Sequence, residues 1–415
     1  MAERKRVVVT GMGAMTPLGE TIDEYWGNLI KGVSGIGPMT QADPTGFPTS
    51  IAGEVRSFDP VSYIDAKEAR RMARFAQLGV ASALRAAENA GLDASNIVSE
   101  ESGVVLGNGN GGMPTTEEQA KVLFDRGGMK ESPFFIPMVL PNMAAAQISR
   151  TLGLKGYTNT VITACAAGTQ AIGEGAEVIR RGTAKVVFAG GTEAGICQLS
   201  LGGFSVIRAL STRNDEPQKA SRPFEANRDG FVPGEGAGIL VLEEMEHAIS
   251  RGAPILAEIV GYGVSSDAYH PVHPDEKGEG AARAMSWAIA DAGLTPPDID
   301  YINAHGTSTP INDAIETLAI KRVFGDGAYH VPISSTKSMI GHAMGGSGGV
   351  EAVAAVKTIQ TGIMHPTINY ETPDPACDLD YVPNEARKKE VRTVLSNSFG
   401  FGGQNACLVI RRFEE

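Results

Sequence analysis

The stretch Val161-Ile162-Thr163-Ala164-Cys165-Ala166-Ala167-Gly168 passes from a β-branched run through one cysteine into small residues. This order predicts a strand over 161–163 and a helix that starts at Cys165. The helix should end at Arg180-Arg181-Gly182, where two cations and a glycine favour a C-terminus. A thiol in the first turn of a helix meets free N–H groups and the positive end of the helix dipole, and both favour the thiolate. Cys165 is therefore a candidate nucleophile.

The other interpretation of Cys165 is a buried small hydrophobic side chain, the usual fate of a free cysteine. We apply that interpretation to Cys197, Cys377 and Cys407, which lack the position at a helix start. The four cysteines are widely spaced and form no CxxC pair, which argues against a zinc site or a disulfide framework. They are typical of a reducing, cytoplasmic compartment.

The order of strand and helix around Cys165 is repeated along the chain. Helical periodicity covers 66–90, up to Gly91, and again 350–359, which corresponds to the helix after Cys165. The sequence therefore predicts an α/β protein of two similar halves, 1–254 and 255–415, with its chemistry where they meet. Strands are expected at 7–9, 104–106, 161–163 and 186–189, and again at 255–260, 301–304, 333–336 and 394–397.

Length and composition are those of a soluble globular enzyme, with 415 residues, 42% hydrophobic and 20% charged. The net charge of −12 argues against nucleic acid as the main partner. The apolar run that follows Met1 is far too short for the core of a signal peptide, and no window reaches the length of a transmembrane helix. We expect a cytoplasmic protein without a membrane partner.

Glycine-rich segments follow two of the expected strands. Gly11-Met12-Gly13-Ala14-Met15-Thr16 resembles a dinucleotide fingerprint, but the third glycine is absent and no acidic residue ends a second strand at the expected distance. A tight turn is the better interpretation there. The run 107–112, which contains Asn110, permits close backbone approach with or without a ligand.

Three side chains downstream could act with Cys165. His305 lies at a strand end before glycine and three hydroxyl residues, a better place to meet a substrate than to satisfy a core. Lys337 and His342 flank a glycine-containing turn after another apolar strand. Lys337 is either a solvated surface lysine or, as its position favours, buried with a partner. One cysteine, two histidines and one lysine are typical of acyl-thioester chemistry.

At this point the chain resembles a known family, the elongating β-ketoacyl-acyl carrier protein synthases, and within it synthase II. The resemblance covers nearly the whole chain and implies an α/β fold of the thiolase-like, pseudo-duplicated type, in which two βαβ-type halves form α/β/α/β/α layers. Thiolases use a second cysteine as base, and initiating synthases use cysteine, histidine and asparagine; the set Cys165, His305 and His342 resembles the decarboxylating class. The motifs that carry the resemblance are Thr163–Cys165, Gly190–Glu193, Ser211–Asn214, Ser221–Phe224, Arg228–Phe231, Asn303–Pro310, Ser335–His342 and Asn397–Gly403.

The resemblance implies a ping-pong reaction. Cys165 takes an acyl chain from acyl carrier protein, His305 and His342 stabilise the enolate formed when malonyl carrier protein loses CO₂, and the chain grows by two carbons. Lys337 would order this site, and the backbone N–H groups of Cys165 and Phe401 would form the oxyanion hole. No cofactor is implied beyond the phosphopantetheine of the carrier.

Further roles are carried over residue by residue. The family implies a homodimer in which Phe135 lines the partner's acyl tunnel together with Asn110, and it implies a structural Na⁺ or K⁺ in some members. The implied positions are Phe399, Phe401 and Asn110 for gating; Thr307 and Thr309 for pantetheine; Lys67, Arg70, Arg71, Arg74 and Arg208 for carrier docking; and Asn303, Glu351 and Ser396 for the cation.

Some positions depart from the family pattern. Asn110 stands where an apolar gating residue is common, Val272 where threonine is common, and Gln404 where threonine or histidine is common. The Asn110 amide either bonds the local glycine-rich backbone or faces the acyl tunnel.

Three other functions compete with this one. A discrete ketosynthase of polyketide or polyene biosynthesis would share every catalytic residue. A non-catalytic chain-length partner is opposed by Cys165, and a nicotinamide oxidoreductase by the broken glycine fingerprint.

Overall fold

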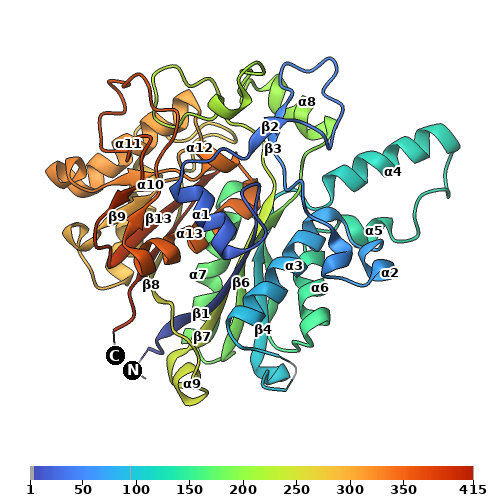
Figure 1. The fold of residues 1–415 in the computed structure, drawn as a ribbon, viewed down its shortest axis with the longest axis horizontal. Coiled ribbons are helices and arrows are strands. Elements are labelled where there is room, and N and C mark those ends of the chain that lie inside the picture. The colour runs from blue at the N-terminus through green and yellow to red at the C-terminus, as the bar shows by residue number, and fades with distance from the viewer. Residues whose placement is uncertain (1–3, 94, 415) are drawn as a thin grey trace.

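The computed structural model describes residues 4–93 and 95–414. Its ten-stranded mixed sheet divides into two halves with the same pattern, and Figure 1 shows their arrangement. In each half the first three strands are parallel and the last two antiparallel. In the first half the order of strands is β5 (Thr158–Val161), β4 (Ser102–Gly107), β6 (Val186–Glu193), β7 (Gly236–Glu244) and β1 (Val7–Met15). In the second half it is β10 (Ile333–Ser334), β9 (Tyr301–Asn303), β13 (Thr393–Gly400), β14 (Gln404–Arg411) and β8 (Ala257–Ser266).

The two halves of the sheet join at β1 and β8, where Val8 pairs with Glu258 and Val9 with Ala257. Helices α7 (Ala167–Arg180) and α13 (Ser347–Thr361) pack on each other and contact strands of both halves. The other helices that cover the sheet are α3 (Arg74–Asn89) on β1, β7 and β6, and α10 (Glu279–Asp291) on β8 and β14, with α11 (Pro310–Phe324) against α10. The predicted thiolase-like α/β/α/β/α layering is confirmed.

Glycine explains why the central helices approach the strands so closely. A Cβ on Gly349 of α13 would lie 2.2 Å from the Gly238 carbonyl of β7, and a Cβ on Gly168 of α7 would lie 2.8 Å from the Gly345 carbonyl. Neither contact is tolerable, so these positions need glycine. The close packing brings the starts of α7 and α13, and with them the segments around Cys165 and His342, to the centre of the molecule.

Three sequence-based predictions are wrong. The strand expected over 161–163 is β5, which ends at Val161, and Cys165 lies in a 3₁₀ turn (Ala164–Ala166) before α7 rather than at its start. The helix expected over 66–90 is two helices, α2 (Ala66–Ala69) and α3, because the chain turns between them and buries Met72 and Ala73. Most of the turn expected at 11–16 is strand, because β1 continues to Met15. Its glycines serve packing, since a Cβ on Gly13 would lie 2.1 Å from the Ser82 carbonyl of α3.

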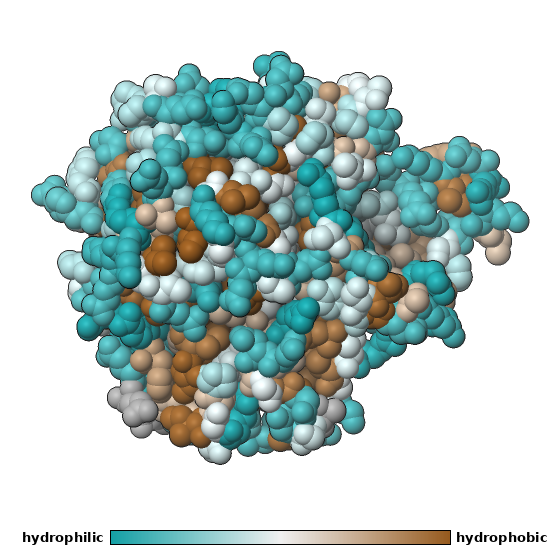
Figure 2. Space-filling model, in the orientation of Figure 1, coloured by the Kyte–Doolittle hydropathy of each residue, from teal (hydrophilic) through white to brown (hydrophobic). Residues whose placement is uncertain are grey.

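An arm stands out from the body of the molecule (Figures 1 and 2). It consists of α4 (Met113–Arg126) and the loop to α5 (Phe135–Val139), and it exposes Phe124 (84%) and Met129 (97%). No helix in the described part of the chain is long and apolar enough to cross a membrane. The remaining elements are α1 (Ile22–Ile30), β2 (Ile36–Pro38), β3 (Ile51–Gly53), α6 (Met143–Leu152), α8 (Gln198–Val206), α9 (Met245–Ser250), α12 (Lys337–Ile340), β11 (Ile363–Met364) and β12 (Arg387–Lys388).

Candidate active site

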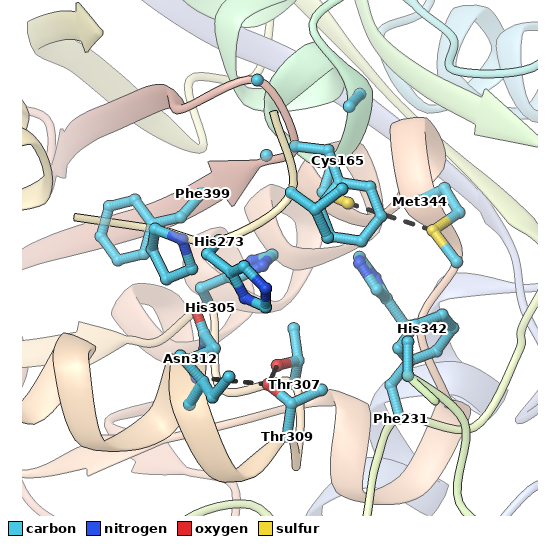
Figure 3. Close-up of a pocket in the computed structure, with 18 of the residues that line it drawn as sticks. Cys165, Phe231, His273, His305, Thr307, Thr309, Asn312, His342, Met344 and Phe399 are labelled. Carbon is cyan, nitrogen blue, oxygen red and sulfur yellow. Dashed lines mark hydrogen bonds between the residues drawn. The ribbon is translucent and has the colours of Figure 1, made fainter. Parts of the chain in front are cut away.

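A cavity of about 730 Å³ opens where the two halves meet, and Figure 3 shows its lining. Cys165 enters it from the single 3₁₀ turn between β5 and α7, His305 from the end of β9, and His342 from the loop after α12. The three side chains point into the same space although 140 residues separate Cys165 from His305 in the sequence. The structure therefore brings together the predicted cysteine and both predicted histidines.

Cys165 is 7% exposed, and its Sγ lies 4.0 Å from the Sδ of Met344. Ala164, just before it, has a φ of 50°, a left-handed conformation that is costly for a non-glycine residue. Burial raises the pKa of the thiol to about 12, although Lys337 and the backbone N–H groups of Phe401 and Cys165 act to lower it. The expectation that the helix start alone favours a thiolate is thus corrected, because desolvation outweighs these charges.

His305 and His342 lie with their ring centroids 5.4 Å apart and their planes nearly perpendicular. Burial, followed by the nearby Lys337 charge, holds the pKa of both imidazoles well below the ordinary 6.5. Both rings are therefore neutral near pH 7 and can present an N–H group to an oxygen. His342 Nδ1 lies 3.0 Å from the Ser347 hydroxyl, which orients this ring.

Lys337 is fully buried, as its position between a strand and a turn predicts. Its Nζ donates to the His305 carbonyl at 2.6 Å and forms an ion pair with Glu351. Lys337 thus links the backbone of His305 to α13, which begins five residues after His342.

Glu316 was missed by the sequence analysis. Its carboxylate accepts the backbone N–H groups of His305 (2.9 Å) and Gly306 (2.8 Å), and burial raises its pKa to about 7. The sequence carries no local signal for it, because the burial of Asp313 and Glu316, which are spaced three apart on α11, is seen only in the structure. Two acidic side chains on a core-facing helix surface indicate a polar partner.

The predicted gate lies against the nucleophile. A Cβ on Gly400 would lie 2.6 Å from the Thr163 carbonyl and 3.1 Å from the Cys165 nitrogen, so the Phe399–Phe401 segment is in tight contact with the start of α7. The Phe399 ring packs on His305 with centroids 5.7 Å apart, and the Phe401 ring is partly exposed at the cavity.

The Asn110 side chain lines the same cavity. Its backbone N–H donates to Glu193 at 3.3 Å, but no hydrogen bond joins its amide to any residue within 4–93 or 95–414. The interpretation that this amide bonds the local glycine-rich backbone is therefore not what the structure has.

The two predicted pantetheine residues also line the cavity. Thr307 and Thr309 have hydroxyls 2.9 Å apart, and Thr309 caps α11 by accepting the Asn312 N–H. Arg208 is exposed beside them. His273, which the sequence analysis did not single out, lies near His305 and Phe399 (Figure 3).

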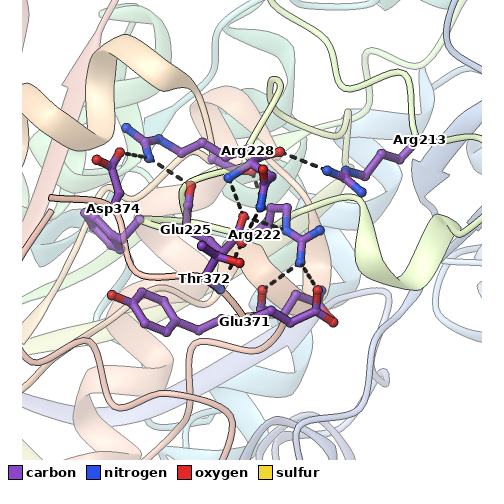
Figure 4. Close-up of polar contacts among 12 residues, drawn as sticks. Arg213, Arg222, Glu225, Arg228, Glu371, Thr372 and Asp374 are labelled. Carbon is purple, nitrogen blue, oxygen red and sulfur yellow. Dashed lines mark hydrogen bonds and ion pairs between the residues drawn. The ribbon is translucent and has the colours of Figure 1, made fainter. Parts of the chain in front are cut away.

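A polar network supports this loop from behind (Figure 4). The Arg228 guanidinium donates to the carbonyls of Thr309 (3.2 Å) and Pro310 (2.9 Å), and it pairs with Asp374. Arg222 pairs with Glu225 in the same network. Arg228 thus holds the Thr309 turn against the C-terminal segment.

Other predicted residues lie away from the cavity. Phe135 is the first residue of α5, where the arm ends, and does not line the cavity. Lys67 and Arg70 are exposed, whereas Arg71 pairs with Glu68. Arg74 forms two hydrogen bonds of 2.8 Å with the buried Glu235, so Arg74 has a structural role.

The residues of the predicted cation site are buried and close together. Asn303 Nδ2 donates to Ser396 Oγ at 3.3 Å. Asn303 Oδ1 and Glu351 Oε2 are buried and have no hydrogen-bond partner among the described residues. Orphaned carbonyl and carboxylate oxygens fit an alkali cation, which takes oxygen ligands.

The comparisons with known proteins agree with this geometry. The beta-ketoacyl synthase N-terminal domain matches residues 4–248, and the C-terminal domain matches residues 256–371. The chain is 51% identical to 3-oxoacyl-acyl-carrier-protein synthase 2 of Synechocystis over 412 residues, 99% of each chain. It is 50% identical to the protein of that name from Staphylococcus aureus (strain N315) over 414 residues, 100% of each chain.

A solved beta-ketoacyl synthase from Burkholderia phymatum STM815 has a TM-score of 0.92 and 38% identity, covering 99% of this chain and 100% of that one. A type II PKS acyl-carrier protein in complex with its ketosynthase bound to the hexaketide has a TM-score of 0.90 and 36% identity, with the same coverage. The chain therefore belongs to the beta-ketoacyl synthase family of condensing acyltransferases.

Proposed function

We propose that this protein is a 3-oxoacyl-acyl carrier protein synthase that extends a fatty acyl chain by two carbons. The observation that carries the proposal is the cavity itself, in which a buried cysteine faces two neutral imidazoles held by a buried lysine–carboxylate pair. Identity of about 50% over the full chain to proteins with that name supports it. We also propose that 1–254 and 255–415 are its two structural halves.

In the first step, Cys165 Sγ attacks the thioester carbonyl of an acyl carrier protein. The thiol is protonated at rest, so its proton must pass to a neutral imidazole of the cavity as the S–C bond forms. The backbone N–H groups of Cys165 and Phe401, which face the sulfur, receive the developing oxyanion. The carrier thiolate leaves and takes up a proton.

In the second step, malonyl carrier protein enters along Thr307 and Thr309. Its C–C bond to the carboxylate breaks, CO₂ departs, and the electron pair moves to the thioester oxygen. N–H groups of His305 and His342 stabilise that charge, and their lowered pKa keeps them from being protonated in advance. The carbanion then attacks the acyl carbonyl on Cys165, the C–S bond breaks, and the 3-oxoacyl product forms while the released Cys165 thiolate takes up a proton from solvent.

Lys337 and Glu316 are positioning residues in this proposal. Lys337 holds the His305 carbonyl and Glu316 holds its N–H, so both sides of the His305 peptide are fixed. A structural Na⁺ or K⁺ would be held by Asn303, Glu351 and Ser396 and would give a partner to the Glu351 oxygen that Lys337 does not contact. The organic step itself uses no cofactor.

Acyl carrier protein is the proposed partner, docking through Lys67, Arg70, Arg71 and Arg208 at a cavity whose mouth includes Arg208. Arg74 is left out because Glu235 already engages it. A cytoplasmic homodimer is proposed from the family resemblance and from the exposed apolar residues of the arm, through which Phe135 would reach a second copy.

Intact-protein mass spectrometry with a panel of acyl carrier proteins tests the function. We expect saturated acyl chains to add to Cys165 and to appear as 3-oxoacyl carrier protein once malonyl carrier protein is supplied. Failure to load or extend saturated chains, with polyketide intermediates accepted instead, would overturn the fatty acid assignment.

A further inference from the structure

Two cavities meet behind Cys165 and share part of their walls. The main cavity has about 730 Å³ and the second about 20 Å³, and both are lined by Asn110, Phe204 and Met344. We call these three side chains the partition. The second cavity has room for about one water molecule, far too little for an acyl chain. As long as the partition stays in place, an acyl chain cannot extend into it.

Glu193 holds the backbone on both sides of the partition. Its Oε2 accepts the N–H of Gly109 at 2.8 Å and of Gly345 at 3.2 Å, and its Oε1 accepts the N–H of Asn110 at 3.3 Å. The side chain is fully buried. One carboxylate thus ties the segment that carries Asn110 to the turn that carries Met344.

The packing around this carboxylate leaves little room for movement. A Cβ on Gly109 would lie 2.7 Å from Glu193 Oε2, and a Cβ on Gly345 would lie 2.5 Å from the Gly109 nitrogen. Met344 has a φ of 41°, a left-handed conformation that persists only where the surroundings enforce it. The bond from the Gly345 N–H to Glu193, next in the chain, is one of the contacts that hold this turn.

The chemistry of the Glu193 carboxylate suits a tether whose hydrogen bonds can be broken. Hydrogen bonds to an ionised acceptor are about twice as strong as neutral ones. Burial raises the pKa of Glu193 to about 7, and the three backbone donors with Asn108 limit the rise. The walls beyond the partition are apolar, with Ile196, Leu201 and Leu210, so they would accept methylene groups if the partition moved.

We propose that Glu193 is a positioning residue that keeps the partition closed and thereby limits the length of the acyl chain that Cys165 accepts. This inference rests on the acyl-transfer function proposed above. A longer chain must displace Asn110 or Met344, and that displacement breaks bonds to Glu193. No such bond joins Glu193 to His305 or His342 among the described residues, so the malonyl half of the reaction is independent of the tether.

The test compares Glu193→Gln and Glu193→Asp with the control Glu243→Gln. Glu243 is equally buried, but it bonds Thr10, His247 and Arg251, which line neither cavity. The readouts are acyl loading across short, medium and long chains, malonyl decarboxylation, and hydrogen exchange of 108–112 and 343–346 without substrate.

In Glu193→Gln we expect the ratio of long-chain to short-chain loading to rise about tenfold, the effect of losing roughly one hydrogen bond to a charged group. Decarboxylation should stay within about twofold of wild type, which corresponds to less than about half a kcal/mol in activation free energy. Both segments should exchange faster. Glu193→Asp is too short to reach both segments and should give a smaller shift of the same sign, whereas the control should give none.

An unchanged chain-length profile in folded Glu193→Gln would overturn the proposal. Parallel loss of loading at every length together with decarboxylation would also overturn it, because that is the result of a merely structural role. If wild type loads no acyl chain, the proposed function fails instead, and unchanged hydrogen exchange in Glu193→Gln would then refute the tether separately.

Discussion

The ends of β4 and β9 occupy equivalent places in the two halves, each between two parallel neighbours in the sheet. After each strand, a buried carboxylate receives two consecutive backbone N–H groups. Glu193 receives Gly109 and Asn110, and Glu316 receives His305 and Gly306. Burial raises the pKa of both carboxyls to about 7.

The difference lies in what each carboxylate positions and where it comes from. Glu193 is the last residue of β6 and positions Asn110 at the acyl partition, whereas Glu316 lies on α11 and positions an imidazole. The duplicated scaffold thus keeps the backbone arrangement and assigns the two halves different tasks. Under the proposed function, the N-terminal half supplies the nucleophile and Asn110 of the partition. The C-terminal half supplies the two imidazoles for decarboxylation and also contributes Met344 to the partition.

The largest expected effect comes from changing Cys165, which should remove acyl loading but leave malonyl decarboxylation. Cys165→Gln should abolish acyl loading and condensation, a loss on the order of 10⁴-fold or more for removal of a nucleophile. Malonyl decarboxylation should persist, because His305 and His342 lie in the other half. CO₂ release and 3-oxoacyl product are measured side by side, with Cys165→Ala as a second variant. Condensation in either variant would contradict the assignment of the nucleophile.

The second prediction removes the carboxylate of the C-terminal half. Glu316→Gln should lower decarboxylation by about 10–100-fold, because the His305 loop loses two charge-assisted bonds and with them its alignment. Acyl loading on Cys165 should fall much less. The kcat of CO₂ release at saturating malonyl carrier protein is the measurement, and Glu243→Gln is the matched control. Equal losses of loading and decarboxylation would argue against separate tasks.

The third prediction changes the residue that Glu193 positions. Asn110→Ile replaces an amide without a protein partner by an apolar side chain, and burying such an amide costs roughly 1–3 kcal/mol. We expect loading to shift toward longer saturated chains by several-fold, since each buried methylene contributes about 0.8 kcal/mol. Coincident loading profiles of variant and wild type across chain lengths would show that Asn110 does not set the preference.

The smallest expected effect is on stability and should appear in both halves alike. A carboxyl whose pKa is raised from 4.5 to about 7 in the folded state stabilises the fold at low pH, and that contribution is lost as pH rises through 7. The destabilisation caused by Glu193→Gln or Glu316→Gln should therefore shrink between pH 4.5 and 7, by about 3 kcal/mol at most at about 1.4 kcal/mol per pKa unit. Urea unfolding at several pH values measures it, and a pH-independent difference would contradict the raised pKa.

Much of this protein could be predicted from its sequence because the decisive signals are local. A β-branched run followed by a cysteine and small residues predicts a strand and then a helix, and β5 and α7 follow in that order, although β5 ends at Val161 and α7 begins only at Ala167. The repeated order of strands and helices predicts the duplicated sheet, and Lys337, placed between a strand and a turn, is buried with a partner as expected. These features depend on the periodic spacing of residue types, which can be read directly from the sequence.

The tertiary structure decided what depends on burial and on contacts between distant segments. The sequence favours a thiolate at Cys165, but only the packing of Met344 and the surrounding chain determines the desolvation that raises the thiol pKa to about 12. In the sequence, Gly11 and Gly13 indicate a turn. In the structure both lie in β1, where α3 packs so closely that a side chain would not fit. Glu193 and Glu316 have no local signature of their tasks, because the N–H groups that they receive belong to segments brought near them only when the two halves fold together.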